Sequence, residues 1–377
     1  MWRIDEAAVE RIATGAGILG TGGGGNPYLG KLHLLRLLRE GAPPPTVVAP
    51  EEVPDDALIV TVGGMGAPTV GLERPARGDE WTVALRTLEA HLGRRADLLV
   101  PGEIGGANST RPLVCACQTG LPVVDGDGMG RAFPELQMKT FSIYGIKATP
   151  AALCDVRHNT ALFPDLADTR TLERYARAVT IQMGGHAGYA FVPMRGADLK
   201  RAIIPHTMTL ARDLGAAVEA ARRAHADPIA AALAVTGGQV LFGGKIADVE
   251  RRMAAGFARG AVRIEGLADW RGATLTIDFQ NENLIARRND GLDATAQIIA
   301  VVPDLICIVD SETAAPVTTE VLRYGLRVTV LGIPAPPLLR TPTALAVVGP
   351  RAFGYDVEYT PLPGEYGQRV RYDEETL

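Results

Sequence analysis

Residues 97–130, DLLVPGEIGGANSTRPLVCACQTGLPVVDGDGMG, decide the fold of this chain. The apolar runs at 97–100 and 121–124 are short, as buried strands are, and the segment between them has a helical pattern that Gly120 ends. A strand, a helix and a second strand in this order are typical of a βαβ unit with parallel strands. The stretch therefore predicts an α/β domain with a parallel sheet.

The same alternation continues toward the N-terminus. Residues 57–62, ALIVTV, predict a further buried strand, and residues 80–92 have the apolar spacing of a helix. A glycine-rich loop follows each strand, and in a parallel sheet such loops leave from one edge, where open α/β folds bind ligands. We place this N-terminal domain at residues 1–168 and expect its ligand site at that edge.

The pattern changes beyond residue 168. Residues 169–377 combine helical segments with many short apolar runs after residue 260, which predicts a second, strand-rich α+β domain at the C-terminus. Two domains also suit a chain of 377 residues, because single cores rarely grow beyond about 250–300 residues. Individual assignments in this half are a strand pair at 178–183 and 189–193, a helix at 246–257 and a strand at 344–348.

Composition narrows the class of protein. The net charge is −5 and no basic block is present, which argues against nucleic acid as a partner. No apolar run approaches the roughly 18 residues of a membrane helix, and the charged N-terminus lacks the apolar core of a signal peptide. Four cysteines suit a reducing compartment. We expect a cytoplasmic protein that acts on a small molecule, away from membranes, as a homo-oligomer by default.

A turn of four glycines joins two predicted helices at 4–19 and 28–39. In Thr21-Gly22-Gly23-Gly24-Gly25-Asn26-Pro27, Asn26 suits a helix N-cap and Pro27 suits the first helical turn. Free N–H groups at such a helix start attract a carboxylate or a phosphate. A plain helix-to-helix connection is the alternative, and the turn lacks the Gly-Lys-Ser/Thr of a phosphate loop.

Acidic side chains follow the predicted strands. Glu103 and Asn108 lie after the strand at 97–100, and Asp125 and Asp127 come directly after the strand at 121–124. Because these strand ends share one edge, Glu103, Asp125 and Asp127 should lie near one another, and neighbouring carboxylates raise one another's pKa. They are candidates for proton transfer or for holding a cation, although the full calcium-loop pattern is missing. Helix capping and a solvated acidic turn are the alternatives.

His186 is a further candidate, since it stands between glycines in Gly184-Gly-His-Ala-Gly188 and is easily exposed to a site. A polar turn residue would look the same in the sequence. The chain has no His-x-x-x-His or Glu-x-x-His pair of the kind that binds zinc. A histidine past residue 168 would place the site in a cleft between the two domains.

Taken together, the motifs resemble one bacterial family. The matching stretches are Thr21-Gly-Gly-Gly-Gly-Asn-Pro-Tyr28, Gly-Gly-Met65-Gly-Ala-Pro68, Gly-Glu103-Ile-Gly-Gly-Ala-Asn-Ser109, Asp125-Gly-Asp-Gly-Met-Gly-Arg-Ala-Phe-Pro-Glu135-Leu-Gln137 and Phe279-Gln-Asn-Glu-Asn283. The family, formerly a domain of unknown function, is associated with S-methyl thiohydantoin desulfurase activity and has an N-terminal and a C-terminal domain. The resemblance spans nearly the whole chain.

The resemblance implies hydrolysis of a cyclic isothiourea, in which water displaces methanethiol and leaves a hydantoin. A base must activate the water, and Glu103 or Asp127 fits; His186 or the other carboxylate would supply the acid. A divalent metal such as zinc would do the same work with Asp125 and Asp127, joined by Glu103 and His186, as candidate ligands. No cofactor is certain. Substrate-binding candidates are Gly22, Gly23, Gly24, Gly25, Asn26, Met65, Asn108, Arg131 and Glu135.

Two other functions remain compatible with these residues. One is a non-catalytic metabolite-binding or regulatory subunit of a hydantoin-processing pathway, which would use the glycine loops to hold an anion without turnover. The other is a nucleotide-dependent enzyme, which the four glycines favour and the missing phosphate-loop lysine disfavours. Acidic groups that converge on a histidine favour the hydrolase.

Overall fold

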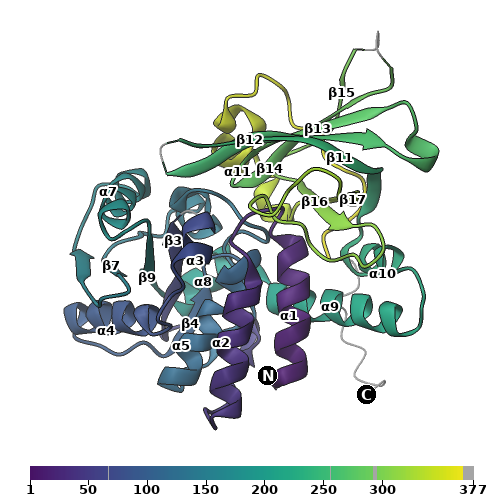
Figure 1. Ribbon diagram of the computed structural model, residues 1–377. Coiled ribbons are helices and arrows are strands. Elements are labelled where there is room, and N and C mark those ends of the chain that lie inside the picture. The colour runs from purple at the N-terminus through teal and green to yellow at the C-terminus, as the bar shows by residue number, and fades with distance from the viewer. Residues whose placement is uncertain (67, 255, 292–294, 368–377) are drawn as a thin grey trace.

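The βαβ alternation builds a mixed sheet in the N-terminal half of a computed structural model, which describes residues 1–66, 68–254, 256–291 and 295–367 (Figure 1). The sheet has the strand order β1-β2-β5-β4-β3-β9-β7-β8. β2, β5, β4 and β3 run parallel, and the outer strands pair antiparallel. The bounds are β1 Trp2–Arg3, β2 Thr46–Val48, β3 Leu58–Gly66, β4 Leu98–Pro101, β5 Val123–Val124, β7 Ala151–Cys154, β8 Thr160–Phe163 and β9 His186–Arg195.

Helices cover both faces of this sheet, because its central strands are apolar on both sides. In β4, Leu99 packs in the core that contains helix residues Leu85 and Leu113, while Leu98 and Val100 face the core that contains Leu172. The helices of the first face are α1 Glu6–Leu19, α2 Pro27–Arg39, α4 Glu80–Leu92 and α5 Arg111–Thr119. Those of the second are α6 Thr140–Ile143, α7 Thr169–Gln182 and α8 Gly196–Ala202. The short helix α3 spans Pro68–Glu73.

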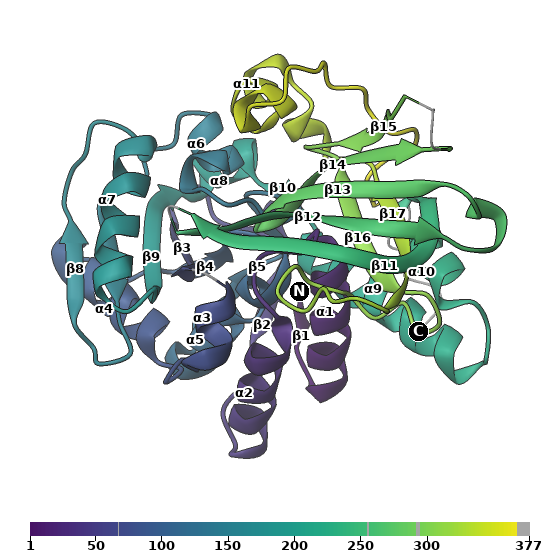
Figure 2. The same cartoon turned by 45° about the horizontal axis from the view of Figure 1, so that its top comes forward.

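The C-terminal half forms a seven-stranded antiparallel sheet with the order β15-β14-β13-β12-β11-β17-β16. Figure 2 shows its long strands side by side, with one end reaching toward α7. The bounds are β11 Gln239–Ala254, β12 Phe257–Gly266, β13 Thr274–Gln280, β14 Glu282–Asn289, β15 Gln297–Val301, β16 Leu305–Asp310 and β17 Arg327–Ile333. The predicted fold class, an α/β part with parallel strands followed by a strand-rich α+β part, is confirmed.

The two halves share a core. Helix α9, Thr207–Arg223, packs against α1, and β16 and β17 add Leu305, Cys307 and Leu331 to the same apolar cluster. Helix α10, Pro228–Thr236, follows α9, and a two-stranded ribbon pairs β6, Gly126–Asp127, with β10, Ile204–Pro205. β9 lies beyond residue 168 yet pairs with β3, so strands of the first sheet come from both sides of the predicted boundary. The division into 1–168 and 169–377 stays a prediction.

Three secondary-structure predictions were wrong. Residues 178–182 continue α7 and Met183 is its C-cap, so 178–183 form no strand, because Asp168 caps the helix and Leu172, Ala176 and Thr180 repeat along its buried face. The helix-forming residues of 246–254 lie in β11, where pairing with β12 overrides their propensity. Residues 344–348 lie in α11, Pro342–Val348, because Thr341 caps the N–H of Ala344.

None of the helices in the described ranges has both the length and the apolar character that crossing a membrane requires. All four cysteines fall within the described chain; they are buried, and none forms a disulfide.

Candidate active site

A cavity of about 370 Å³ opens between the strand ends of the first sheet and the start of β14. Its walls come from the four-glycine turn, the ends of β3 and β4, the start of β9, and segment 129–139. Figure 1 shows that these elements meet between the two sheets. Eight of the residues predicted for the site line this cavity: Gly24, Gly25, Asn26, Met65, Glu103, Asn108, Glu135 and His186. The other five, Gly22, Gly23, Asp125, Asp127 and Arg131, are not among its lining residues.

Glu103 is the buried carboxylate of this cavity. It follows β4, and 6% of its surface is exposed. Oε1 accepts a short hydrogen bond from the Asn108 amide, and Oε2 accepts the Phe133 N–H at 3.2 Å. Burial raises the pKa of Glu103, while Asn108 and the charge of Lys139 oppose that rise. A carboxylate with a raised pKa, fixed at both oxygens, is suited to accept a proton.

A chain of polar contacts runs from Glu103 to His186. The Asn108 Oδ1 accepts the Gly64 N–H at 2.8 Å and an Arg111 N–H at 2.5 Å. Arg111 also donates to Nε2 of His186 at 3.0 Å. Burial and the neighbouring arginine lower the pKa of His186 to about 3, so the ring is neutral and Nε2 is its acceptor. His186 therefore orients Arg111, which in turn orients the Asn108 amide on Glu103.

Lys139 is a site residue that the sequence analysis did not identify. It lines the cavity next to Tyr189, with Nζ 5.3 Å from the centroid of the tyrosine ring, and 3% of its surface is exposed. Burial lowers the pKa of Lys139 to about 8, against the opposing charge of Glu103. The only sequence signal for it was its place two residues after the Glu135-Leu-Gln137 motif.

The second sheet contributes Glu282, a carboxyl group that is 2% exposed. Its Oε1 accepts the Gly24 N–H at 3.3 Å, and within the described residues Oε2 has no hydrogen-bond partner. A Cβ on Gly23 would lie 2.0 Å from Oε1, so only glycine lets the turn approach this carboxyl. Burial and the charge of Glu103 raise the pKa of Glu282 well above its usual range. The four-glycine turn thus holds a carboxyl of the protein itself.

Asn26, Met65 and Glu135 shape the rest of the wall. The Asn26 side chain caps α2 by accepting the Tyr28 N–H at 2.9 Å, as the sequence predicts. The Glu135 carboxylate accepts a hydrogen bond from the Gln137 amide. Met65 is buried and lies in β3, where it pairs with Ala187 of β9.

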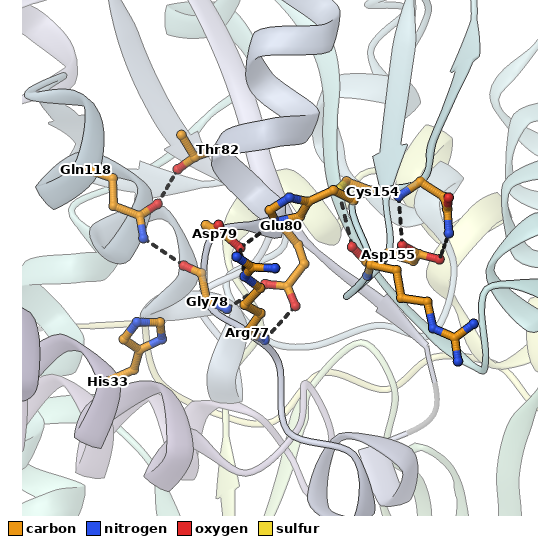
Figure 3. Close-up of polar contacts among 12 residues, drawn as sticks. His33, Arg77, Gly78, Asp79, Glu80, Thr82, Gln118, Cys154 and Asp155 are labelled. Atoms are coloured by element: carbon orange, nitrogen blue, oxygen red, sulfur yellow. Dashed lines mark hydrogen bonds and ion pairs between the residues drawn. The ribbon is translucent and has the colours of Figure 1, made fainter.

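At the rim of the cavity, residues 77–79 form a loop that polar contacts fix in place (Figure 3). The Glu80 carboxylate accepts the N–H groups of Arg77 and Gly78, each at 2.7 Å, and the Gln118 amide donates to the Gly78 carbonyl at 2.8 Å. Arg77 and His33 line the cavity beside this loop. Arg77 also forms an ion pair with Asp79 of the same loop, 3.7 Å from Nε to the carboxylate.

Asp125 supports a helix instead of facing the cavity. Its Oδ1 accepts the Thr209 N–H at 3.0 Å, and its Oδ2 accepts the Thr209 hydroxyl at 2.5 Å. Oδ2 also lies 3.7 Å from Nδ1 of His206, and this carboxylate raises the pKa of His206. Asp125 thereby caps the first turn of α9 from a distant part of the chain.

Asp127 joins the loops that follow β4 and β6. Its Oδ2 accepts three backbone N–H groups, from Ile104 at 2.9 Å, Met129 at 2.9 Å and Gly130 at 2.8 Å. The predicted convergence of the strand-end loops is visible in these bonds. Full burial nevertheless raises the pKa of Asp127 to about 7.

Asp127→Asn is expected to stabilise the protein progressively as pH rises. The folded carboxyl keeps a proton that the unfolded chain loses near its ordinary pKa of 3.8, so wild-type stability falls between about pH 4 and pH 7. The variant lacks this titration, so above pH 7 its free energy of unfolding should exceed that of the wild type by on the order of 2–4 kcal/mol. Urea unfolding of both proteins at pH 4.5 and pH 8 measures this stability difference. A difference that does not change with pH would contradict the raised pKa of Asp127.

The candidate metal ligands do not form one cluster within the described residues. No group of three or more His, Cys, Asp or Glu side chains among these residues is arranged to bind a metal ion. Of the four candidate ligands, Asp125 and Asp127 are held by their own partners away from the cavity, and Nε2 of His186 is already bound by Arg111.

Comparison with known proteins gives a consistent family and fold. The model of the S-Me-THD-like N-terminal domain matches residues 7–165, and that of the S-Me-THD-like C-terminal domain matches residues 167–362. The X-ray crystal structure of a protein from Chromobacterium violaceum is similar, with 25% identity and a TM-score of 0.78 over 96% of this chain and 100% of that chain. No curated protein matches the sequence.

Proposed function

The chain belongs to the S-Me-THD-like family, and we propose that it is a hydrolase that removes methanethiol from a cyclic S-methyl thiohydantoin-type substrate. The product would be the corresponding hydantoin. The observation that carries this proposal is Glu103, a buried carboxylate fixed at both oxygens in a cavity that the Lys139 ammonium also lines. A cavity of about 370 Å³ lies within the range of small-molecule sites.

Glu103 is the base in this reaction. It accepts a proton from water as the water oxygen bonds to the ring carbon that carries the S-methyl group, and it passes that proton to the ring nitrogen. The result is a neutral tetrahedral intermediate with Glu103 again ionised. Burial supports this step, because the raised pKa of Glu103 brings its basicity closer to that of the group it must deprotonate.

Asn108, Arg111 and His186 position the base. The Asn108 amide holds Oε1 of Glu103, and Arg111 holds the opposite end of that amide while bound to a neutral histidine. We assign His186 to this positioning role because a ring with a pKa of about 3 is neutral at neutral pH, and the N–H of a neutral imidazole is too weak an acid to protonate the substrate. Asp127, bound by three backbone N–H groups, fixes the loop that follows Glu103.

The test is direct. Purified protein is incubated with an S-methyl thiohydantoin, and released methanethiol is measured with and without a chelator. Catalytic release that chelation leaves unchanged supports carboxylate-activated water. Release that chelation abolishes would establish a metal requirement and overturn the role of Glu103 as sole activator. Tight binding of the compound without release would favour the metabolite-binding subunit instead.

A further inference from the structure

Resting on the proposed function, we propose that Lys139 is the acid of the site and gives its proton to the sulfur that leaves. Lys139 is a buried cation in the wall of the cavity, and in the described chain its ammonium forms no hydrogen bond. Although Nζ has no hydrogen-bond partner among the described residues, it is not sealed from solvent. A buried ammonium that opens on a cavity has its donors available for a ligand.

The position of the ammonium is fixed from one side. Tyr189 of β9 lies under Nζ at 5.3 Å, and its ring stacks on Phe191 with 4.5 Å between the centroids. Gly63 and Gly102 leave room for the tyrosine hydroxyl, since a Cβ on either would lie within 2.4 Å of it. The cation–π contact directs the lysine while leaving its N–H groups free.

Charged groups from several elements surround Lys139. Glu103 after β4, Glu173 of α7 and Asp127 of β6 favour its protonated form, whereas Arg177 of α7 disfavours it. Burial is the largest influence and leaves its pKa at about 8. At neutral pH the ammonium is thus mostly protonated yet more acidic than an ordinary lysine, as proton donation requires.

In the second half of the reaction, methanethiol leaves and the carbonyl of the hydantoin forms. The hydroxyl proton of the intermediate moves to the Glu103 carboxylate as the carbonyl forms and the carbon–sulfur bond breaks. The sulfur keeps the electron pair of that bond and takes a proton from Lys139, which gives methanethiol. The protonated Glu103 then returns a proton to the lysine amine. Water and substrate have become hydantoin and thiol, and both side chains are restored.

The test compares leaving groups. Lys139→Met is assayed with an S-methyl substrate and with its S-(2,2,2-trifluoroethyl) analogue, whose small leaving thiol is more acidic and needs less protonation. We expect the variant to lose about 10²–10⁴-fold in kcat on the S-methyl substrate and at least tenfold less on the analogue. Lys147→Met, which removes an exposed lysine paired with Asp165, is the matched control and should behave as wild type.

A second variant tests the proposal even if Lys139→Met fails to fold. Lys139→Arg keeps the positive charge but does not titrate below about pH 12, so the fall in wild-type kcat above about pH 8 should disappear from its profile. A kcat loss in Lys139→Met that is equal on both substrates, or a retained alkaline limb in Lys139→Arg, would overturn the assignment while the hydrolase stands. Wild-type protein that releases thiol from neither substrate would overturn both.

Discussion

Glu103→Gln should reduce kcat for methanethiol release by about 10²–10⁴-fold, with little change in KM. The amide occupies the same volume and can still accept the hydrogen bond from Asn108, but it cannot take a proton from water. Removing a group that acts in the transition state lowers kcat, whereas binding of the ring depends on the rest of the cavity wall. Steady-state assays with an S-methyl substrate measure both constants.

Glu320→Gln is the matched control for this variant. Glu320 is also a largely buried carboxyl whose pKa is raised by burial, but it does not line the cavity. Its substitution should leave kcat unchanged. A Glu103→Gln variant with wild-type kcat would remove Glu103 from the chemistry, and a variant that loses binding alone would make it a recognition residue.

Strand-end reasoning pointed to the edge of the sheet where the cavity lies, because its signals are local. An apolar run followed by a glycine-rich loop marks the end of a parallel strand, and this placed Glu103 and Asn108 correctly at the sheet edge. It does not give the direction of a side chain. Asp125 and Asp127 leave the same edge, yet one turns toward α9 and the other toward the backbone of the neighbouring loop.

The contribution of the second half of the chain was harder to predict. Glu282 reaches the cavity because β14 lies against a turn more than 250 residues earlier in the chain, and no local pattern records that contact. The role that we propose for Lys139 rests on its burial and on the tyrosine ring beside it, which depend on the complete fold. The same dependence explains residues 246–254 of β11, where pairing with β12 outweighs a helical composition.

Arg131→Met should destabilise the protein by about 3–5 kcal/mol. Arg131 is fully buried and donates to five acceptors that come from both halves of the chain: Thr21, Ala132, Asn283, Pro303 and Asp304. Methionine keeps much of the volume but leaves these oxygens without a donor, and each unpaired buried acceptor costs about 1–3 kcal/mol. The expected loss is below the simple sum because neighbouring groups relax.

The loss should appear as a lower urea midpoint, followed by tryptophan fluorescence. Since the acceptors lie at the end of α1, in β14 and in the turn before β16, the variant should also unfold less cooperatively, with separate transitions for the two halves. Arg263→Met is the control, because that side chain is half exposed and its pairing with Glu265 should contribute less than about 1 kcal/mol. An Arg131→Met midpoint equal to that of the control would show that the halves are held together by their shared apolar core alone. In that case the arginine in the Gly-Met-Gly-Arg motif would have to be explained by ligand binding, as the sequence first suggested.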